Sequence, residues 1–377
     1  CFSGAGVCKE RFTFSAKDQI VLMTELNEAG DEFEELPYPW QEPLWQDLSA
    51  AFTKQRLAHS LLITGVSGLG KTDFLTAFSR LMICASPSGT RACGSCVNCL
   101  QGGRDFHPDI LDISIEEGSK EIKVDQIRAL SEFAHKTSHS GSCKVVLIQD
   151  AHRLNISAAN ALLKTLEEPS PNTFIFLVSD LPGRLLPTIR SRCQTIKFPT
   201  ANREQAEAWL EGRLSESDKE DLVELLEASF NRPLYALSLA EEGELKSLSE
   251  FLRILYKLKA GSATLHSVTG LATKIGCGKT LHYLSLFSTA LIKKLIGSET
   301  EAESEETSDS RNSAITELCS RVNCTQSTLK LALRELLVFD QELNKARRQL
   351  TSTTNPNPQL LLESILWQWD KLPLVVE

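Results

Sequence analysis

The sequence predicts an α/β domain that binds a phosphate-bearing ligand, followed by helical domains. Between residues 40 and 200, short apolar runs alternate with stretches of helical periodicity, a pattern typical of a sheet covered by helices. After residue 200 the apolar positions follow helical spacing throughout. A glycine-rich string at residues 65–72 lies between the first apolar run and a helical stretch, which is where phosphate-binding loops occur.

Five apolar runs are the expected strands of the sheet. They are short, rich in Leu, Ile, Val and Phe, and separated by longer segments that can hold the covering helices. The expected strands are residues 60–64, 110–114, 145–149, 174–179 and 195–198.

The rest of the chain divides by composition. Residues 1–36 are expected to be a flexible or non-native lead, because the part before Met23 lacks the layout of a signal peptide and the part after it is acidic. The expected domains are an α/β domain over 37–200, a small helical domain over 201–243 and a larger helical domain over 244–377.

The net charge of -9 is concentrated in two acidic segments. Six acidic residues lie within residues 25–35 and six within 299–309, with no Lys or Arg in either, and the second segment predicts a disordered loop. The rest of the chain carries a net charge of +3. This balance argues against an autonomous DNA-binding protein and permits a modest basic face within an assembly.

Neither membrane insertion nor secretion is expected. The longest apolar runs fall well short of a bilayer span. The chain has 11 cysteines without a secretory signal, which fits a reducing compartment, where clustered thiols bind metal more often than they form disulfides. We therefore predict a cytoplasmic protein without a membrane partner.

The string GVSGLGKT matches the phosphate-loop pattern at every required position. Backbone N–H groups of the loop are expected to face the phosphates of ATP or ADP, Lys71 to neutralise them, and Thr72 to place its hydroxyl on Mg²⁺. The alternative is a glycine-rich turn without a ligand. A second string, GCGKT at 276–280, lacks the first glycine of the pattern because Thr273 stands there. The nucleotide-binding residues are Gly65, Val66, Ser67, Gly68, Leu69, Gly70, Lys71 and Thr72.

The residues after the third expected strand argue against efficient hydrolysis. Hydrolysis requires an aspartate that holds Mg²⁺, followed by an acid that orients the attacking water. Gln149 takes the first position and Asp150 the second. A neutral amide is a poor ligand for Mg²⁺. We therefore expect a site that can hold nucleotide, with Mg²⁺ held weakly if at all.

Four cysteines downstream of the phosphate loop have the spacing C-x8-C-x2-C-x2-C and predict a structural Zn²⁺ site. Four thiolates close a tetrahedron and leave no position for a catalytic water. An iron–sulfur cluster fits less well, because the fourth cysteine of that pattern is missing. Free thiols without a metal are the other alternative. His107 is a rival ligand for the metal. The expected ligands are Cys84, Cys93, Cys96 and Cys99.

Several strings together resemble one family. The chain is similar to the delta-prime subunits of bacterial DNA polymerase III clamp loaders, from about residue 38 to residue 240. The similarity rests on the phosphate loop, the cysteine insert, YPW (38–40), HPD (107–109), ANALLKTLEEP (159–169) and SRC (191–193).

The resemblance implies an AAA+ module with a helical lid at 201–243 and a helical, oligomerising collar at 244–377. It implies a stator in an assembly with gamma or tau ATPase subunits and a delta subunit, which loads the sliding clamp onto primed DNA. Arg192 would be an arginine finger that acts in trans on a neighbouring ATP site. Ser179 would lie at the first sensor position, while Leu234 replaces the second sensor arginine, with Arg232 two residues away.

Two other functions are alternatives to the stator. An active motor subunit of the gamma or tau kind would carry Asp-Glu where this chain has Gln149 and Asp150. A zinc-dependent nucleic-acid enzyme would need an open metal position, which four thiolates deny. The helix predicted from the ANALLKTLEEP string has an apolar face for packing, and Lys164 on it is a candidate phosphate contact.

Overall fold

The structure is a computed structural model, and it describes residues 36–101, 107–139, 141, 143–300, 318–319, 321–323, 328–350 and 357–376. The described residues leave out nearly all of the expected lead at 1–36, most of the expected acidic loop at 299–309, and Cys324. The chain divides into two compact units, with the boundary between Ala201 and Asn202.

The first unit contains a five-stranded parallel sheet, which confirms the predicted α/β class. The strand order is β2-β3-β4-β1-β5, so β1 lies between β4 and β5. Every observed strand agrees with its predicted range to within one residue at each end. The strands are β1 (Ser60–Thr64), β2 (Ile110–Ile113), β3 (Lys144–Ile148), β4 (Thr173–Ser179) and β5 (Gln194–Lys197).

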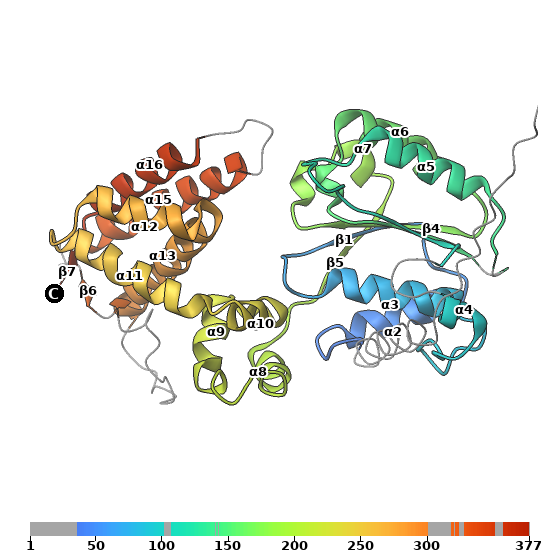
Figure 1. Ribbon diagram of the computed structural model, residues 1–377, viewed down its shortest axis with the longest axis horizontal. Helices are drawn as coiled ribbons and strands as arrows, with labels where there is room; N and C mark the ends of the chain where they lie inside the picture. Colours follow the sequence, from blue (N-terminus) through green and yellow to red (C-terminus); the bar gives the residue numbers. More distant parts are fainter. Residues whose placement is uncertain are drawn as a thin grey trace, which may run out of the picture. The chain divides into compact units, whose positions relative to one another are not determined.

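Helices cover both faces of this sheet (Figure 1). Two helices, α2 and α3, pack on one face, and three helices, α5, α6 and α7, pack on the other. The bounds are α2 (Glu42–Thr53), α3 (Lys71–Ile83), α4 (Val97–Gln101), α5 (Val124–His135), α6 (Ile156–Glu167) and α7 (Pro187–Arg190), with 3-10 turns η1 (Ala151–Arg153) and η2 (Pro182–Arg184).

The two-sided core follows from the alternation of strand side chains. Leu61 and Ile63 of β1 pack with α2 and α3, whereas Leu62 between them packs with α5 and α6. All three side chains are fully buried. A strand that is apolar on both faces is the pattern of a parallel sheet covered by two helical layers.

The second unit is almost entirely helical. A short antiparallel pair, β6 (Val322–Asn323) with β7 (Val375–Val376), departs from the all-helical prediction. The division of this unit into a lid and a collar stays a prediction. The helices are α8 (Arg203–Glu211), α9 (Leu222–Ala228), α10 (Pro233–Glu241), α11 (Glu244–Lys259), α12 (Leu265–Ile275), α13 (Cys277–Thr300), α15 (Leu329–Leu350) and α16 (Pro358–Lys371), with the 3-10 turn η3 (Lys219–Asp221).

The GCGKT string lies in this helical unit and is not a phosphate loop. Gly276 ends α12 with a φ of 101°, and the following residues begin α13. Lys279 of the string forms ion pairs with Glu242 and Glu244 instead of facing a loop. Among the described residues, no helix is both long and apolar enough to cross a membrane.

Candidate functional site

The phosphate loop connects β1 to α3 at the carboxyl edge of the sheet. Gly68 and Gly70 have φ values of 81° and 77°, in the left-handed region that favours glycine. At Gly70 the space is closed as well, because an added Cβ would lie 2.8 Å from both Gln41 Nε2 and Tyr38 Cε2. The loop sequence is therefore fixed by its backbone conformation and by the segment packed against it.

The segment packed against the loop contains the YPW string. The Trp40 indole donates a hydrogen bond to the Leu69 carbonyl oxygen at 3.0 Å. The buried Gln41 amide donates to the carbonyl oxygens of Leu69 at 2.9 Å and Gly70 at 3.2 Å. The rings of Tyr38 and Trp40 stack with centroids 5.0 Å apart. The role of Gln41 was not predicted, because nothing in the local sequence pairs it with residues 28 and 29 positions away.

Lys71, the cation of the loop, is buried and has two partners. Its Nζ donates to the Val66 carbonyl oxygen at 2.6 Å, across the loop. It also forms an ion pair with Asp180 Oδ1 at 2.7 Å. The exposed fractions of the two side chains are 5% and 30%. Sequence reasoning missed Asp180, although it follows a predicted strand, and the carboxyl ends of neighbouring parallel strands meet at one edge.

Thr72 and Gln149 meet beside this lysine. The Thr72 hydroxyl donates to Gln149 Oε1 at 2.9 Å, and Gln149 Nε2 lies 3.4 Å from Asp112 Oδ2. The predicted metal-binding hydroxyl and the residue at the predicted aspartate position are thus in contact. In this arrangement the Gln149 amide is the hydrogen-bond partner of the Thr72 hydroxyl.

Ser179 is the last residue of β4, and Asp150 lies just after β3. Ser179 is fully buried, and its hydroxyl accepts a hydrogen bond from the Leu181 backbone N–H at 3.2 Å. Its Oγ also lies 3.5 Å from His152 Nδ1, and burial lowers the pKa of His152 below its usual range. Asp150 begins η1 with a φ of 46°. His152 is a further residue at this edge that the sequence did not indicate.

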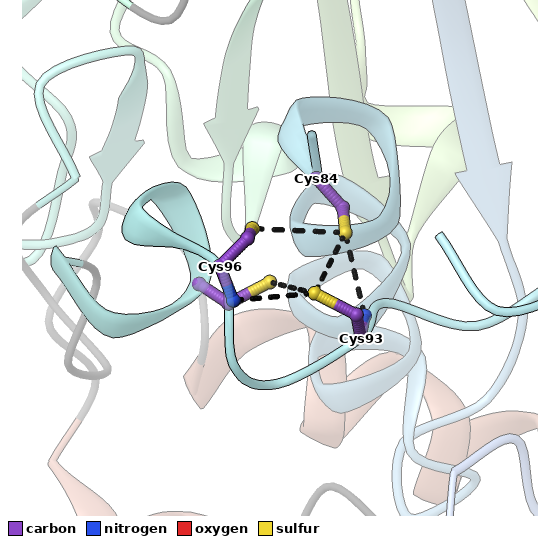
Figure 2. Close-up of side chains that lie close together, drawn as sticks. Cys84, Cys93 and Cys96 are labelled. Carbon is purple, nitrogen blue, oxygen red and sulfur yellow. Dashed lines mark hydrogen bonds between the residues drawn. The ribbon is translucent and has the colours of Figure 1, made fainter. Parts of the chain in front are cut away.

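The four cysteines of the insert converge on one point, and Figure 2 shows Cys84, Cys93 and Cys96 turned toward one another. Their sulfur atoms all lie within 4.8 Å of one another. The Sγ–Sγ distances are 3.5 Å for Cys84–Cys93, 3.9 Å for Cys84–Cys96 and 4.0 Å for Cys93–Cys99. Four sulfurs at about 2.3 Å from a tetrahedral Zn²⁺ lie about 3.8 Å apart, so the donor set fits this ion.

Local contacts hold the cysteine insert in place. The Asn98 side-chain amide donates to the Ile83 carbonyl oxygen at 2.7 Å and ties α4 to the end of α3. The Trp45 indole donates to the Thr90 carbonyl oxygen at 2.9 Å and ties the insert to α2. Backbone N–H groups near Cys93 donate to its sulfur and lower its pKa to about 6. Burial instead raises the pKa of Cys84 and of Cys99 above the ordinary range of a thiol.

His107 is not part of the cysteine cluster. It is buried, and its Nδ1 accepts a hydrogen bond from the Asp109 backbone N–H at 3.1 Å. Asp109 in turn is fully buried and accepts hydrogen bonds from the Ser138 hydroxyl and the His139 backbone N–H, at 3.0 and 2.8 Å. The HPD string therefore has a structural role: it anchors the segment before β3.

Arg192 lies just after α7, and its guanidinium is held by two oxygens. Nε donates to Glu167 Oε1 at 2.7 Å, and Nη2 forms an ion pair with the same carboxylate. Nη1 donates to the Thr188 carbonyl oxygen at 3.0 Å. The Arg192 side chain is 34% exposed, so the guanidinium is positioned and still accessible.

The helix predicted from ANALLKTLEEP is α6. The Asn155 side chain caps its N-terminus by accepting from the Ala158 backbone N–H at 2.8 Å, and Leu162 and Leu166 are buried on its packing face. Lys164 on this helix is exposed. In the second unit, Arg232 lies over the Tyr235 ring at 4.4 Å, and its Nε donates to the Ser229 carbonyl oxygen at 2.6 Å.

These observations define an α/β protein with a loop of the phosphate-loop sequence, a cluster of four cysteines that fits a metal ion, and a partly exposed arginine just before β5. Residues 40–202 match the family described as DNA polymerase III, delta subunit. The DNA polymerase III subunit delta' of Pseudomonas aeruginosa is 30% identical over 336 residues, which are 89% of this chain and 98% of that protein. The chain belongs to the delta' family of DNA polymerase III subunits.

Two further relatives show how far the similarity extends. The subunit delta' of Escherichia coli is 30% identical over 87% of this chain and 94% of that protein. The subunit tau of Bacillus subtilis is also 30% identical, but only over 42% of this chain and 28% of that protein. The similarity to delta' subunits therefore includes the second unit, whereas the similarity to tau covers less than half of the chain.

Proposed function

We propose that this chain is the stator of a bacterial clamp loader, and that it supplies Arg192 in trans to the ATP site of a neighbouring ATPase subunit. The position of Arg192 supports this role, because Glu167 and the Thr188 carbonyl oxygen hold its guanidinium at a partly exposed site. Coverage of nearly the full length of delta' relatives supports the same assignment.

The contacts of Arg192 would allow its guanidinium to leave Glu167 and bind a phosphate group. A planar guanidinium can stabilise charge that develops on a transferring phosphoryl group. Its partner Glu167 is 49% exposed, and ion pairs at such surfaces contribute only about 0–1 kcal/mol. An incoming phosphate can therefore compete with Glu167 at little cost. Meanwhile the buried neighbours Ile189 and Cys193 keep the backbone in place.

The chain's own nucleotide site is proposed to bind ATP or ADP and to hydrolyse ATP slowly. The loop glycines and Lys71 would hold the phosphates, and Mg²⁺ would supply charge neutralisation when bound. Gln149 offers a neutral oxygen beside Thr72 in place of a carboxylate, which weakens the metal position. The cysteine cluster is proposed to hold one structural Zn²⁺, which would tie the insert to the end of α3.

The proposed partners are gamma or tau ATPase subunits and a delta subunit, with the sliding clamp and primed DNA reached through the assembly. The AAA+ lid at 201–243, the collar at 244–377 and a cytoplasmic location belong to the same proposal. The motor alternative is disfavoured by Gln149 and by the limited extent of the similarity to tau.

The test is the ATPase activity of reconstituted complexes, stimulated by clamp and primed DNA. Arg192→Ala is expected to lower this activity several-fold while complex assembly and the zinc content stay unchanged. Arg190→Ala is the matched control, because Arg190 is an exposed arginine at the end of α7, two residues before Arg192. Full activity of an assembled Arg192→Ala complex would reduce Arg192 to a surface charge.

A further inference from the structure

The lysine of the phosphate loop, Lys71, forms an ion pair with Asp180. An ammonium group has three N–H donors, and two of those of Lys71 are directed at Val66 O and Asp180 Oδ1. A phosphate-loop lysine ordinarily reaches both the β- and γ-phosphates. Asp180 therefore takes a position around Nζ at which a phosphate oxygen would bind.

Asp180 also brings a negative charge to the place where a triphosphate would add one. The Lys71 side chain is only 5% exposed, so water screens this contact weakly, and the effect of a second anion at Nζ is strong. A nucleoside triphosphate would place both its β- and γ-phosphates beside Lys71 Nζ, whereas a diphosphate has no γ-phosphate to place there. Repulsion by Asp180 should therefore act more strongly on a triphosphate.

The neighbouring groups at this edge include an amide, an imidazole and two arginines. Among the described residues at this edge, Gln149 provides an amide where a metal-binding carboxylate is expected, so Mg²⁺ is a weak source of compensating charge. His152 lies near Asp180, but burial lowers its pKa and keeps the ring neutral near pH 7. Two cations, Arg153 and Arg184, lie near His152, and Arg184 follows Asp180 on the loop after β4. The group that contacts Lys71 Nζ directly is Asp180.

We propose that Asp180 is a specificity-determining residue that makes this phosphate loop select nucleoside diphosphates over nucleoside triphosphates. The inference rests on the nucleotide binding included in the proposed function and is independent of the arginine finger. Its consequence is a nucleotide site that favours a diphosphate, which gives a second reason, besides Gln149, for slow ATP hydrolysis by this chain.

The test is calorimetric titration of the full-length, zinc-loaded chain with ADP and with ATP, each in a buffer freed of Mg²⁺ before the protein is added, so that no chelator removes the zinc. Wild type is expected to bind ADP at least about tenfold more tightly than ATP, from like-charge repulsion at a buried site. Asp180→Asn keeps an oxygen that can accept from Lys71 and removes the charge. It should raise ATP affinity and bring the two dissociation constants to within about threefold.

Asp125→Asn is the control, because Asp125 is an ion-paired acid of the same unit that contacts Arg128 on α5. It should keep the wild-type ratio. Equal affinity of wild type for ADP and ATP, or an unchanged ratio in a folded Asp180→Asn protein, would overturn the inference. Absence of binding by wild type to either nucleotide would also overturn it. None of these results would affect the proposal for Arg192, which is tested by the activity of the assembled complex.

Discussion

The Arg192 guanidinium is bound through Nε and Nη2 to the carboxylate of Glu167, 25 residues earlier in the chain and at the last residue of α6. The pair connects α6 to the second residue after α7, and so joins the segments of the ANALLKTLEEP and SRC strings. Two strings that were separate family signals in the sequence are therefore one contact in the structure.

The first prediction concerns this pair. Glu167→Gln removes the charge that orients the guanidinium. The ATPase activity of the reconstituted complex is expected to fall several-fold, because an arginine finger that is not held in place contributes less to the rate of hydrolysis. The free energy of unfolding should change by less than about 1 kcal/mol, since the pair is partly exposed. The same change in an Arg192→Ala background should have no further effect on activity. Additive losses would show that Glu167 acts independently of Arg192.

The second prediction concerns Thr72 and Gln149, whose side chains are hydrogen-bonded at 2.9 Å. Gln149→Asp places a carboxylate beside the Thr72 hydroxyl, so Mg²⁺ should tighten nucleotide binding in the variant and have little effect in wild type. Titrations of the chain with ADP, in buffer with Mg²⁺ and in buffer freed of Mg²⁺ beforehand without a chelator, measure this difference. Gln149→Asn controls for the shorter side chain without the charge. A wild-type chain that binds ADP much more tightly with Mg²⁺ would contradict the assignment of Gln149.

The third prediction concerns metal. The purified chain should contain close to one Zn²⁺ with sulfur-only ligation, because four Sγ atoms lie at mutual distances suited to one tetrahedral ion. Cys96→Ser should lose the metal and lower the melting temperature, as measured by elemental analysis and thermal unfolding. Cys277→Ser, in a half-buried cysteine of the second unit, should retain both. A Cys96→Ser protein with full metal content would eliminate this site.

The fourth prediction concerns pH. Burial lowers the pKa of His282 to about 4, and Nε2 of this residue lies 3.0 Å from the Ala228 carbonyl oxygen. The folded state therefore binds fewer protons than the unfolded state between about pH 4 and the ordinary histidine pKa of about 6.5. Stability from this residue is present above that window and is lost as pH falls through it, by roughly 3 kcal/mol at most.

Urea unfolding at pH 7 and at pH 4.5 measures this effect. His282→Gln can keep a donor toward the Ala228 carbonyl oxygen without a titrating ring, so the variant should lose less stability than wild type between the two pH values. The same acid loss in both proteins would assign the effect to other groups.

The sequence predicted the elements of the first unit closely. Strands β1 and β3, for example, are apolar runs whose hydrophobicity alone makes burial on both faces favourable, and their observed limits fall within one residue of those expected. The phosphate loop was also predicted, because its glycines satisfy a local backbone requirement. The convergence of the cysteines was predicted for the same reason, since three of the four lie within seven residues. Each of these properties depends on neighbours along the chain.

The tertiary structure alone decided which side chains meet at the carboxyl edge of the sheet. Asp180 is 109 residues from Lys71, Gln149 is 77 residues from Thr72, and Gln41 is 28 residues from Leu69. The Lys71–Asp180 pair exists because β4 lies next to β1 in a fixed register, with Leu62 opposite Leu177. Gln149 follows β3, the other neighbour of β4, and Gln41 lies on the segment that packs against the loop. Strand order and register are set by the packing of the whole core, in which a shift by one residue would turn every side chain to the opposite face. A single sequence shows the residues that can bind phosphate, and only the register of the sheet determines which acid lies against the lysine.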